Sequence, residues 1–280
     1  MVCELVTIQT TSILIAKHDR VATITLNRPS KLNAFDTTMI QSLGEALASL
    51  LVEEKTIRCV LVTGAGRGFC SGADLDYLVA LRRENRTEEF RRLLEGGRRV
   101  VTLLRRMPMP VIAAVNGPAA GGGASLAMAC DIRIASESAT FTQAFAKVGV
   151  HADFGASFLL PRLVGESKAR ELLFTAETIT AAEACRIGLV SQVVPPEHLP
   201  ASSVSIAKSI ITRAPLPLRL MKQSLVQYSE EAFQEALDRE LEAQLECFAS
   251  DDFLCRLESF VRKGEAELVA RESSDEDGCG

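Results

Sequence analysis

The chain has 280 residues, of which 47% are hydrophobic and 24% are charged, and its formal net charge is −5. This composition is typical of a globular protein, and the length is sufficient for one large core. The acidic balance argues against general binding to nucleic acid or to a membrane surface, so an anionic ligand would need a local group of basic side chains.

The cysteines and histidines give no sign of a metal site. The eight cysteines are scattered without a Cys-x-x-Cys pair, and there are three histidines, at His18, His151 and His198. This spacing predicts neither a metal centre nor a disulfide framework. The chain also lacks a leader-like start and any run of about 18 apolar residues. We therefore expect a cytoplasmic protein that uses no metal and does not act at a membrane.

The first half of the chain alternates between strand and helix patterns. The β-branched runs at residues 12–16 and 21–26 predict a hairpin, and the helical spacing over 36–54 predicts a capped helix. Strand, glycine loop and helix then follow one another twice over residues 58–129, and a short strand comes next at 132–135. This order indicates an α/β fold with parallel strand pairing.

The second half of the chain is mainly helical in pattern. A long helix is already expected at residues 88–106, where the arginines are most simply a solvated face. Amphipathic segments follow at 230–249 and 252–267. Helices placed after a complete α/β unit often pack on a neighbouring subunit. We expect an α/β core at residues 1–200, a helical oligomerisation region at 201–266 and a disordered tail at 267–280.

Two glycine-rich loops each follow a predicted strand. The first, residues 64–75, follows the run at 59–63, and the second, residues 116–125, follows the run at 111–115. Neither has a Gly-Lys-Ser/Thr or a Gly-x-Gly-x-x-Gly pattern. Glycines let a backbone approach a ligand closely, and N–H groups at a helix N-terminus are free to donate. One such loop alone can be only a tight turn, but two can offer one N–H each to the same oxygen, as in an oxyanion hole.

Two polar residues are further candidates. Ser125 lies in Gly123-Ala124-Ser125-Leu126-Ala127, which nearly matches the Gly-x-Ser-x-Gly nucleophile elbow, but the final alanine disfavours a serine hydrolase. Asp153 lies in an apolar loop punctuated by glycine, where its carboxylate can either cap the next helix or act as an acid and base. The residues alone leave both interpretations of Asp153 open, and they favour His151 as a polar neighbour rather than a base.

Several motifs occur in an order that is typical of one family. They are Asn27-Arg28-Pro29 with Asn33-Ala34, residues 69–75, residues 110–129 with Asn116-Gly117 and the triple glycine, Cys130-Asp131-Ile132, and Gly188-Leu189-Val190. Over about residues 13–265 the chain resembles the enoyl-CoA hydratase/isomerase (crotonase) family. The resemblance implies an α/β spiral of ββα turns followed by helices that assemble trimers, often stacked as hexamers. It also implies fatty acid metabolism on an acyl-CoA substrate, with no cofactor besides the coenzyme A that belongs to that substrate.

The resemblance further implies roles for individual residues. The oxyanion hole falls on the backbone N–H groups of Ala73 and Gly122, in agreement with the two loops. The coenzyme A would lie along loops at residues 28–31 and 73–75, and a neighbour's C-terminal helix would supply an aromatic residue and a lysine, here Phe260 and Lys263. The expected substrate-binding residues are Arg28, Lys31, Ala34, Ser71, Gly72, Asp74, Leu75, Ser125, Phe145, Phe260 and Lys263.

The chain departs from the family's hydratase pattern at two positions. Typical hydratases carry two glutamates that hold a water, where this chain has Ser125 and Phe145. Phenylalanine cannot accept a proton and serine is a poor base. Residues 143–165 instead resemble the phenylacetate-pathway isomerase branch, in which a single aspartate, here Asp153, shuttles a proton. We expect double-bond isomerisation, with residues 76–107 shaping the acyl site. The alternatives are hydration by one acid/base and a catalytically reduced protein that binds CoA thioesters.

Overall fold

The main sheet is built as the sequence predicts. The computed structural model describes residues 8–9 and 12–262. In it, β2 (Ile13–His18) and β3 (Val21–Leu26) form an antiparallel hairpin. Strands β3, β4 (Cys59–Gly64) and β5 (Val111–Val115) then pair in parallel. Within the described residues the order is β1-β2-β3-β4-β5-β7-β10, where β1 is Ile8–Gln9, β7 is Ile132–Ser136 and β10 is Gln192–Val194.

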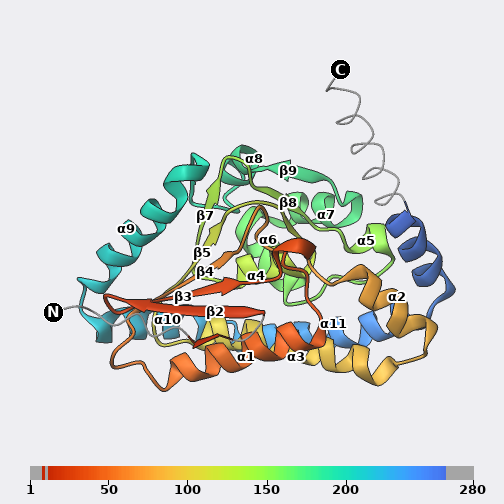
Figure 1. Cartoon of the computed structure of the whole chain (residues 1–280), viewed down its shortest axis with the longest axis horizontal. Helices are drawn as coiled ribbons and strands as arrows, with labels where there is room; N and C mark the ends of the chain where they lie inside the picture. Colours follow the sequence, from red (N-terminus) through yellow and green to blue (C-terminus); the bar gives the residue numbers. More distant parts are fainter. Residues whose placement is uncertain (1–7, 10–11, 263–280) are drawn as a thin grey trace.

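Both faces of the parallel strands are buried. One face packs into the large core with α1 (Thr37–Leu51) and α3 (Thr87–Arg106), and the other packs under α9 (Leu199–Ile211). Along β4, Val60 and Val62 therefore point to the first core, whereas Cys59 and Leu61 point to the second. Figure 1 shows α1 and α3 along one side of the sheet and α9 along the other. Because both faces are covered, the strand sequences are continuous apolar runs.

The helix boundaries follow local capping chemistry. Helix α1 begins where it is expected, because the Asp36 carboxylate accepts the N–H of Met39 at 2.7 Å. Helix α4 (Gly122–Ala129) begins four residues earlier than the expected start near Leu126, so that prediction was wrong. Its first turn is made by glycines, which have poor helix propensity and hide the start. Gly123 is required there, because a Cβ would lie 2.1 Å from the carbonyl oxygen of Cys70.

A smaller sheet, whose first strand precedes α4, and four short helices complete this part of the chain. The sheet has the order β6-β8-β9 within the described chain. Its strands are β6 (Ala119–Ala120), β8 (Thr140–Thr142) and β9 (Thr178–Thr180), and the helices are α5 (Phe145–Val148), α6 (Ala156–Val164), α7 (Glu166–Thr175) and α8 (Ala181–Arg186). The irregular segment between α5 and α6 contains Asp153.

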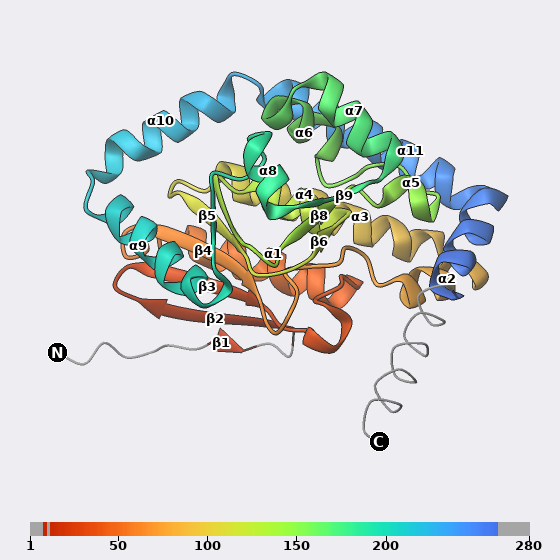
Figure 2. The same cartoon turned by 90° about the horizontal axis from the view of Figure 1, so that it is seen from above.

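The last helices return to the core. Helices α10 (Pro215–Gln227) and α11 (Glu230–Ala249) follow α9, and residues 251–262 are also helical. Helix α11 packs on α3 and α6, as the two views in Figures 1 and 2 show. The predicted tail at 267–280 lies outside the described residues. No helix in the described ranges has an apolar stretch that could cross a bilayer.

Helix α10 is fixed to the core by one buried lysine. The Lys222 ammonium group donates to the Leu104 carbonyl at 3.0 Å, to the Met109 carbonyl at 3.2 Å and to the Asp131 carboxylate at 2.6 Å. Its side chain is 8% exposed and that of Asp131 is 29% exposed. The ammonium group therefore satisfies carbonyls at the end of α3 while it is paired with a carboxylate.

Lys222→Met is expected to lower the free energy of unfolding by about 2 kcal/mol, because it leaves the buried carbonyls of Leu104 and Met109 without this donor. The measurement is urea unfolding followed by circular dichroism. Lys208→Met, at an exposed position of α9, is the matched control and should stay within about 0.5 kcal/mol of the parent. Equal stabilities for the two variants would contradict the role given to Lys222.

Candidate active site

The two glycine loops lie against each other. The N–H of Cys70 donates to the carbonyl of Pro118 at 3.1 Å, and the N–H of Ala120 donates to the carbonyl of Cys70 at 3.0 Å. Gly72 is the point of closest approach: a Cβ there would lie 2.8 Å from the Ala120 oxygen and 3.5 Å from the Gly122 nitrogen. Its φ of +90° also favours glycine. The loops that the sequence places about fifty residues apart thus form one wall.

This wall leaves two backbone N–H groups for a ligand. Around Ala73 the backbone is engaged, because Phe35 donates to the Gly72 carbonyl at 2.6 Å and Asp74 donates to the Phe35 carbonyl at 2.8 Å. Ala73 itself lies outside helix and strand and donates to no other residue of the described chain. Gly122 is the first residue of α4, so its N–H has no partner within the helix. Both residues line the same cavity, which fits an oxyanion hole.

The cavity beside these donors has a volume of about 520 Å³ and is mainly apolar. Helix α2 (Leu75–Arg83) and helix α3 provide much of the apolar wall. Their side chains in it are Leu75, Leu78, Phe90, Leu93 and Leu94. All of them except Leu75 belong to the segment 76–107, which therefore lines the cavity, and the role of this segment in holding an acyl chain stays a prediction. A concave apolar site with a few convergent polar groups is typical of small-molecule binding.

Asp153 enters this cavity from a strained turn. The next two residues, Phe154 and Gly155, have φ angles of +54° and +80°. A left-handed conformation is costly for a phenylalanine and occurs where the surroundings impose it. Here the Phe154 ring stacks on Phe35 with centroids 5.5 Å apart. It also lies against Gly97 of α3, where a Cβ would come within 2.1 Å of the ring.

The Asp153 carboxyl group has one bonded and one unbonded oxygen. Its Oδ2 accepts a hydrogen bond from Nε2 of Gln244 at 2.8 Å. Its Oδ1 is shielded from solvent and has no hydrogen-bond partner in the described chain. A Cβ on Gly122 would lie 3.6 Å from Oδ1, so this oxygen is next to the oxyanion loop. The side chain does not cap α6, where Ala156 donates to the backbone carbonyl of Asp153 instead. The geometry thus favours the acid/base interpretation over the capping one.

The environment of Asp153 favours its protonated form. Burial raises the pKa of Asp153 well above its usual range, because a charged carboxylate loses its hydration. The charge of Glu240 acts in the same direction, and the hydrogen bond from Gln244 opposes both. A carboxyl group whose pKa moves toward neutral pH can both release and accept a proton, which is what a proton shuttle needs.

Helix α11 holds the turn that contains Asp153. The Glu240 carboxylate accepts the N–H of Gly155 at 2.8 Å, the N–H of Ser157 at 2.9 Å and the hydroxyl of Ser157 at 2.5 Å. It satisfies N–H groups at the start of α6 that have no partner within that helix. Gln244 lies four residues later, so both side chains project from one face of α11. The sequence analysis missed both residues, whose only signal is a glutamate and a glutamine on the buried side of an amphipathic helix.

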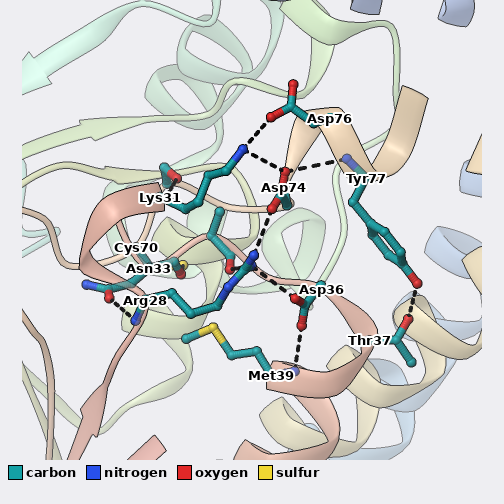
Figure 3. Close-up of polar contacts among 12 residues, drawn as sticks. Arg28, Lys31, Asn33, Asp36, Thr37, Met39, Cys70, Asp74, Asp76 and Tyr77 are labelled. Atoms are coloured by element: carbon teal, nitrogen blue, oxygen red, sulfur yellow. Dashed lines mark hydrogen bonds and ion pairs between the residues drawn. The ribbon is translucent and has the colours of Figure 1, made fainter. Parts of the chain in front are cut away.

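The cations expected to bind coenzyme A are paired with carboxylates. Figure 3 shows Arg28 between Asp74 and Asp36, with guanidinium nitrogens 2.9 Å and 3.3 Å from their oxygens. Arg28 is not among the residues that line the cavity, and it ties the first glycine loop to the start of α1. Its role in substrate binding stays a prediction. Lys31 contacts Asp76 and lines the cavity with a side chain that is 46% exposed, which leaves it at the rim.

The structure separates the other predicted substrate residues into two groups. Those that line the cavity are Ala34, Ser71, Gly72, Asp74, Leu75, Phe145 and Phe260. Ser125 does not, because it is fully buried in α4 and its hydroxyl donates to the Gly121 carbonyl at 3.2 Å. This bond to the preceding turn also removes Ser125 as a nucleophile. Phe260 reaches the cavity of its own chain, where a neighbour's helix was expected, and Lys263 lies outside the described residues.

Comparison with known proteins identifies a family. Residues 16–269 match the family described as enoyl-CoA hydratase/isomerase. The chain is 37% identical to the short-chain-enoyl-CoA hydratase of Clostridium acetobutylicum, over 91% of this chain and 97% of that protein. It is 36% identical to the 1,2-epoxyphenylacetyl-CoA isomerase of Escherichia coli, over 90% of this chain and 95% of that one. A crystal structure of an enoyl-CoA hydratase/isomerase from Xanthobacter autotrophicus has a TM-score of 0.83 at 32% identity, over 95% of this chain and 99% of that one.

The fold brings together two glycine loops, the N–H groups of Ala73 and Gly122 and a buried carboxyl group at one cavity. The family match covers most of the chain, and relatives above 30% identity cover nearly all of it. The protein therefore belongs to the enoyl-CoA hydratase/isomerase family. Relatives of almost equal identity are named as a hydratase and as an isomerase, so the comparisons leave the choice of reaction to the chemistry of the site.

Proposed function

We propose that the protein moves the double bond of an enoyl-CoA thioester. In this proposal the N–H groups of Ala73 and Gly122 bind the thioester oxygen, and Asp153 carries the proton. The observation that supports it best is the unpartnered Oδ1 of Asp153, which is shielded from solvent and adjacent to Gly122. A buried polar atom without a partner is costly and is found where a ligand completes its bonding.

The proposed reaction begins with a 3-enoyl-CoA and the ionised Asp153. Oδ1 takes a proton from the carbon next to the thioester carbonyl, and the electron pair of that C–H bond enters the conjugated system as a dienolate. The negative charge collects on the thioester oxygen, where two fixed N–H donors stabilise it. Asp153 then returns the proton to the γ carbon, and the double bond ends conjugated with the thioester. One carboxyl group completes this cycle.

Hydration is less well served by the same site. It requires a group that positions and activates water as well as one that protonates carbon. The carboxylates that line the cavity in the described chain are Asp74, Asp76 and Asp153, and the first two are paired with Arg28 and Lys31. Phe145 occupies the position of one glutamate of typical hydratases and lines the cavity with an apolar ring. Hydration with Asp153 as the sole acid/base remains the second candidate, because a relative of 37% identity is named as a hydratase.

Two substrates distinguish the reactions. With a 3-enoyl-CoA we expect the absorbance of a conjugated thioester to rise, because isomerisation creates conjugation. With crotonyl-CoA we expect that absorbance to stay constant, whereas a hydratase would remove it. A loss of crotonyl-CoA absorbance that is faster than the rise with 3-enoyl-CoA would reject isomerisation in favour of hydration. Tight binding with no turnover of either substrate would point to a binding protein.

The proposal includes a homo-oligomer, a trimer or a hexamer, that works in the cytoplasm on acyl-CoA without a separate cofactor. Support for assembly comes from α10, which exposes apolar side chains with helical spacing. These are Leu216, Leu220, Met221, Leu225 and, just after the helix, Tyr228. An apolar stripe of this length on a surface helix is typical of a protein interface. Lys31 at the cavity rim is the described cation that a coenzyme A phosphate could reach.

A further inference from the structure

Gln244 is the one side chain that bonds directly to the Asp153 carboxyl group among the described residues. Its Nε2 donates to Oδ2 of Asp153 at 2.8 Å and to the carbonyl of His151 at 2.6 Å. Gln244 is 2% exposed and lines the cavity together with Asp153. The contact joins α11 to a loop that precedes it by 91 residues. No local sequence pattern requires a glutamine at this position, so the contact with Asp153 indicates the role of Gln244.

The orientation of the Gln244 amide is fixed by its two partners. An amide NH₂ group has two protons, and here a carbonyl and a carboxylate oxygen each take one. A flip would place the amide oxygen against two acceptors, which is unfavourable. His151 is itself restrained, because its Nδ1 lies 2.6 Å from the carbonyl of Ala152. The amide therefore binds the loop at His151 and at Asp153, on both sides of Ala152. These bonds restrict the rotation of the Asp153 carboxyl group.

These hydrogen bonds determine which carboxyl oxygen of Asp153 is free to contact the substrate. Oδ2 is occupied by the amide, and Oδ1, adjacent to Gly122, has no partner in the described chain. Four residues before Gln244, Glu240 binds Gly155 and Ser157, so one face of α11 fixes the turn before and after the carboxyl group. Proton transfer is sensitive to distances of a fraction of an ångström, and a group held at one oxygen can present the other reproducibly.

We propose that Gln244 is a positioning residue that holds Oδ2 of Asp153 so that Oδ1 is the atom that removes and returns the substrate proton. The inference rests on the proposed function for the destination of that proton. The amide does not exchange protons with the substrate. It keeps the carboxylate in one rotamer and supplies a hydrogen bond to its charged form.

Other charged groups lie near Asp153, and a test by pH has to take them into account. Glu240 of α11 raises the pKa of Asp153, as burial does. Behind the carboxyl group, Glu95 and Arg98 of α3 line a second, smaller cavity together with Gln244. His151 lies on the same loop. None of these groups changes in a Gln244 variant, so a shift in the titration of Asp153 reports the loss of the amide.

Gln244→Met keeps the length of the side chain and removes both donors. We expect the pKa of Asp153 to rise by about one unit, because its charged form loses a hydrogen bond. The titration is read from the infrared carboxyl band that Asp153→Asn removes. In the pH profile of kcat/KM the ionisation on the acid side should move up by the same amount. We also expect kcat to fall about tenfold to a hundredfold with little change in KM, because the acid is misplaced and substrate binding is not.

Gln223→Met, at an exposed position of α10, is the matched control and should leave titration and kcat as in the parent. Gln244→Leu, which removes both donors without adding a charge, is the second variant in case the first does not fold. A parental titration and kcat in a folded Gln244 variant would overturn the proposal and leave Gln244 a structural residue. If instead Asp153→Asn retains full turnover, the proposed function fails, while the infrared titration still reports whether Gln244 holds Asp153.

Discussion

Asp153→Asn is expected to lower the isomerisation of a 3-enoyl-CoA by about 10³-fold, because general acid–base groups typically contribute 10²–10⁴-fold. Asparagine has almost the same shape, and its oxygen can still accept the hydrogen bond that Gln244 makes to Oδ2. It cannot take a proton from carbon. The change should therefore appear in kcat, with the affinity for acyl-CoA retained. The measurement is the rate of formation of the conjugated thioester, together with a binding titration on the same preparation.

Asp251→Asn, at an exposed position after α11, is the control for an aspartate that does not face the cavity and should keep parental activity. Turnover by Asp153→Asn within tenfold of the parent would exclude Asp153 from the proton transfer.

The same substitution is expected to stabilise the protein at high pH by about 1 kcal/mol, the common size of single stabilising changes. The pKa of Asp153 in the folded state is raised, chiefly by burial, above the value of about 4 that an aspartate has in an unfolded chain. The folded parent thus holds its proton more tightly, and its stability falls as pH rises from about 4 through the raised pKa. In thermal unfolding, Asp153→Asn should have a higher melting temperature than the parent at pH 8. The two melting temperatures should be equal near pH 4.

Gly122→Pro is expected to lower kcat by about 10²–10³-fold, the loss typical of removing one oxyanion donor. Gly122 is the first residue of α4, a position where proline is tolerated because its N–H has no partner in the helix and its fixed φ suits the first turn. The substitution therefore deletes the donor at a point where the helix does not need it. Turnover of the 3-enoyl-CoA and the melting temperature are measured together, so that unfolding is not mistaken for lost chemistry.

Gly122→Ala separates the donor from the added carbon. Its Cβ would lie 3.6 Å from Oδ1 of Asp153 and 3.6 Å from the Phe35 ring, which are ordinary contacts, and its N–H is kept. We expect this variant to stay within about tenfold of the parent. If the alanine and proline variants were equally impaired, the space beside Gly122 and not its N–H would be the important feature.

Most of the fold could be predicted from local patterns in the sequence. The hairpin, the buried strand at Val111–Val115 and the long helix α3 agree with the expected ranges to within one or two residues. Periodicity and β-branched runs carry this information directly. The start of α4 could not be found in this way, because its first residues are glycines, which are poor helix formers, and Gly123 is required by the close approach of the Cys70 carbonyl.

The candidate site was predictable where its chemistry is carried by backbone. The two loops follow from their glycines, because glycines mark close approach, and the family resemblance points to Ala73 and Gly122 within them. The sequence around Asp153 fits a helix cap and a catalytic acid equally well. The hydrogen bond from Gln244, 91 residues away, distinguishes the two roles. The sequence shows the charge of Arg28 but not its partner Asp74, 46 residues later. Long-range pairing of side chains decides these roles, and no local pattern records it.

The dependence of the acid on α11 has a consequence for how the protein can be handled. Residues 230–249 come after the whole α/β core, yet Glu240 and Gln244 within them secure the turn on which Asp153 sits. Cleavage before this helix would remove both contacts to that turn, together with core side chains such as Phe233 and Phe248. A preparation that is shortened or tagged near the C-terminal helices therefore has to be assayed for turnover before it is used.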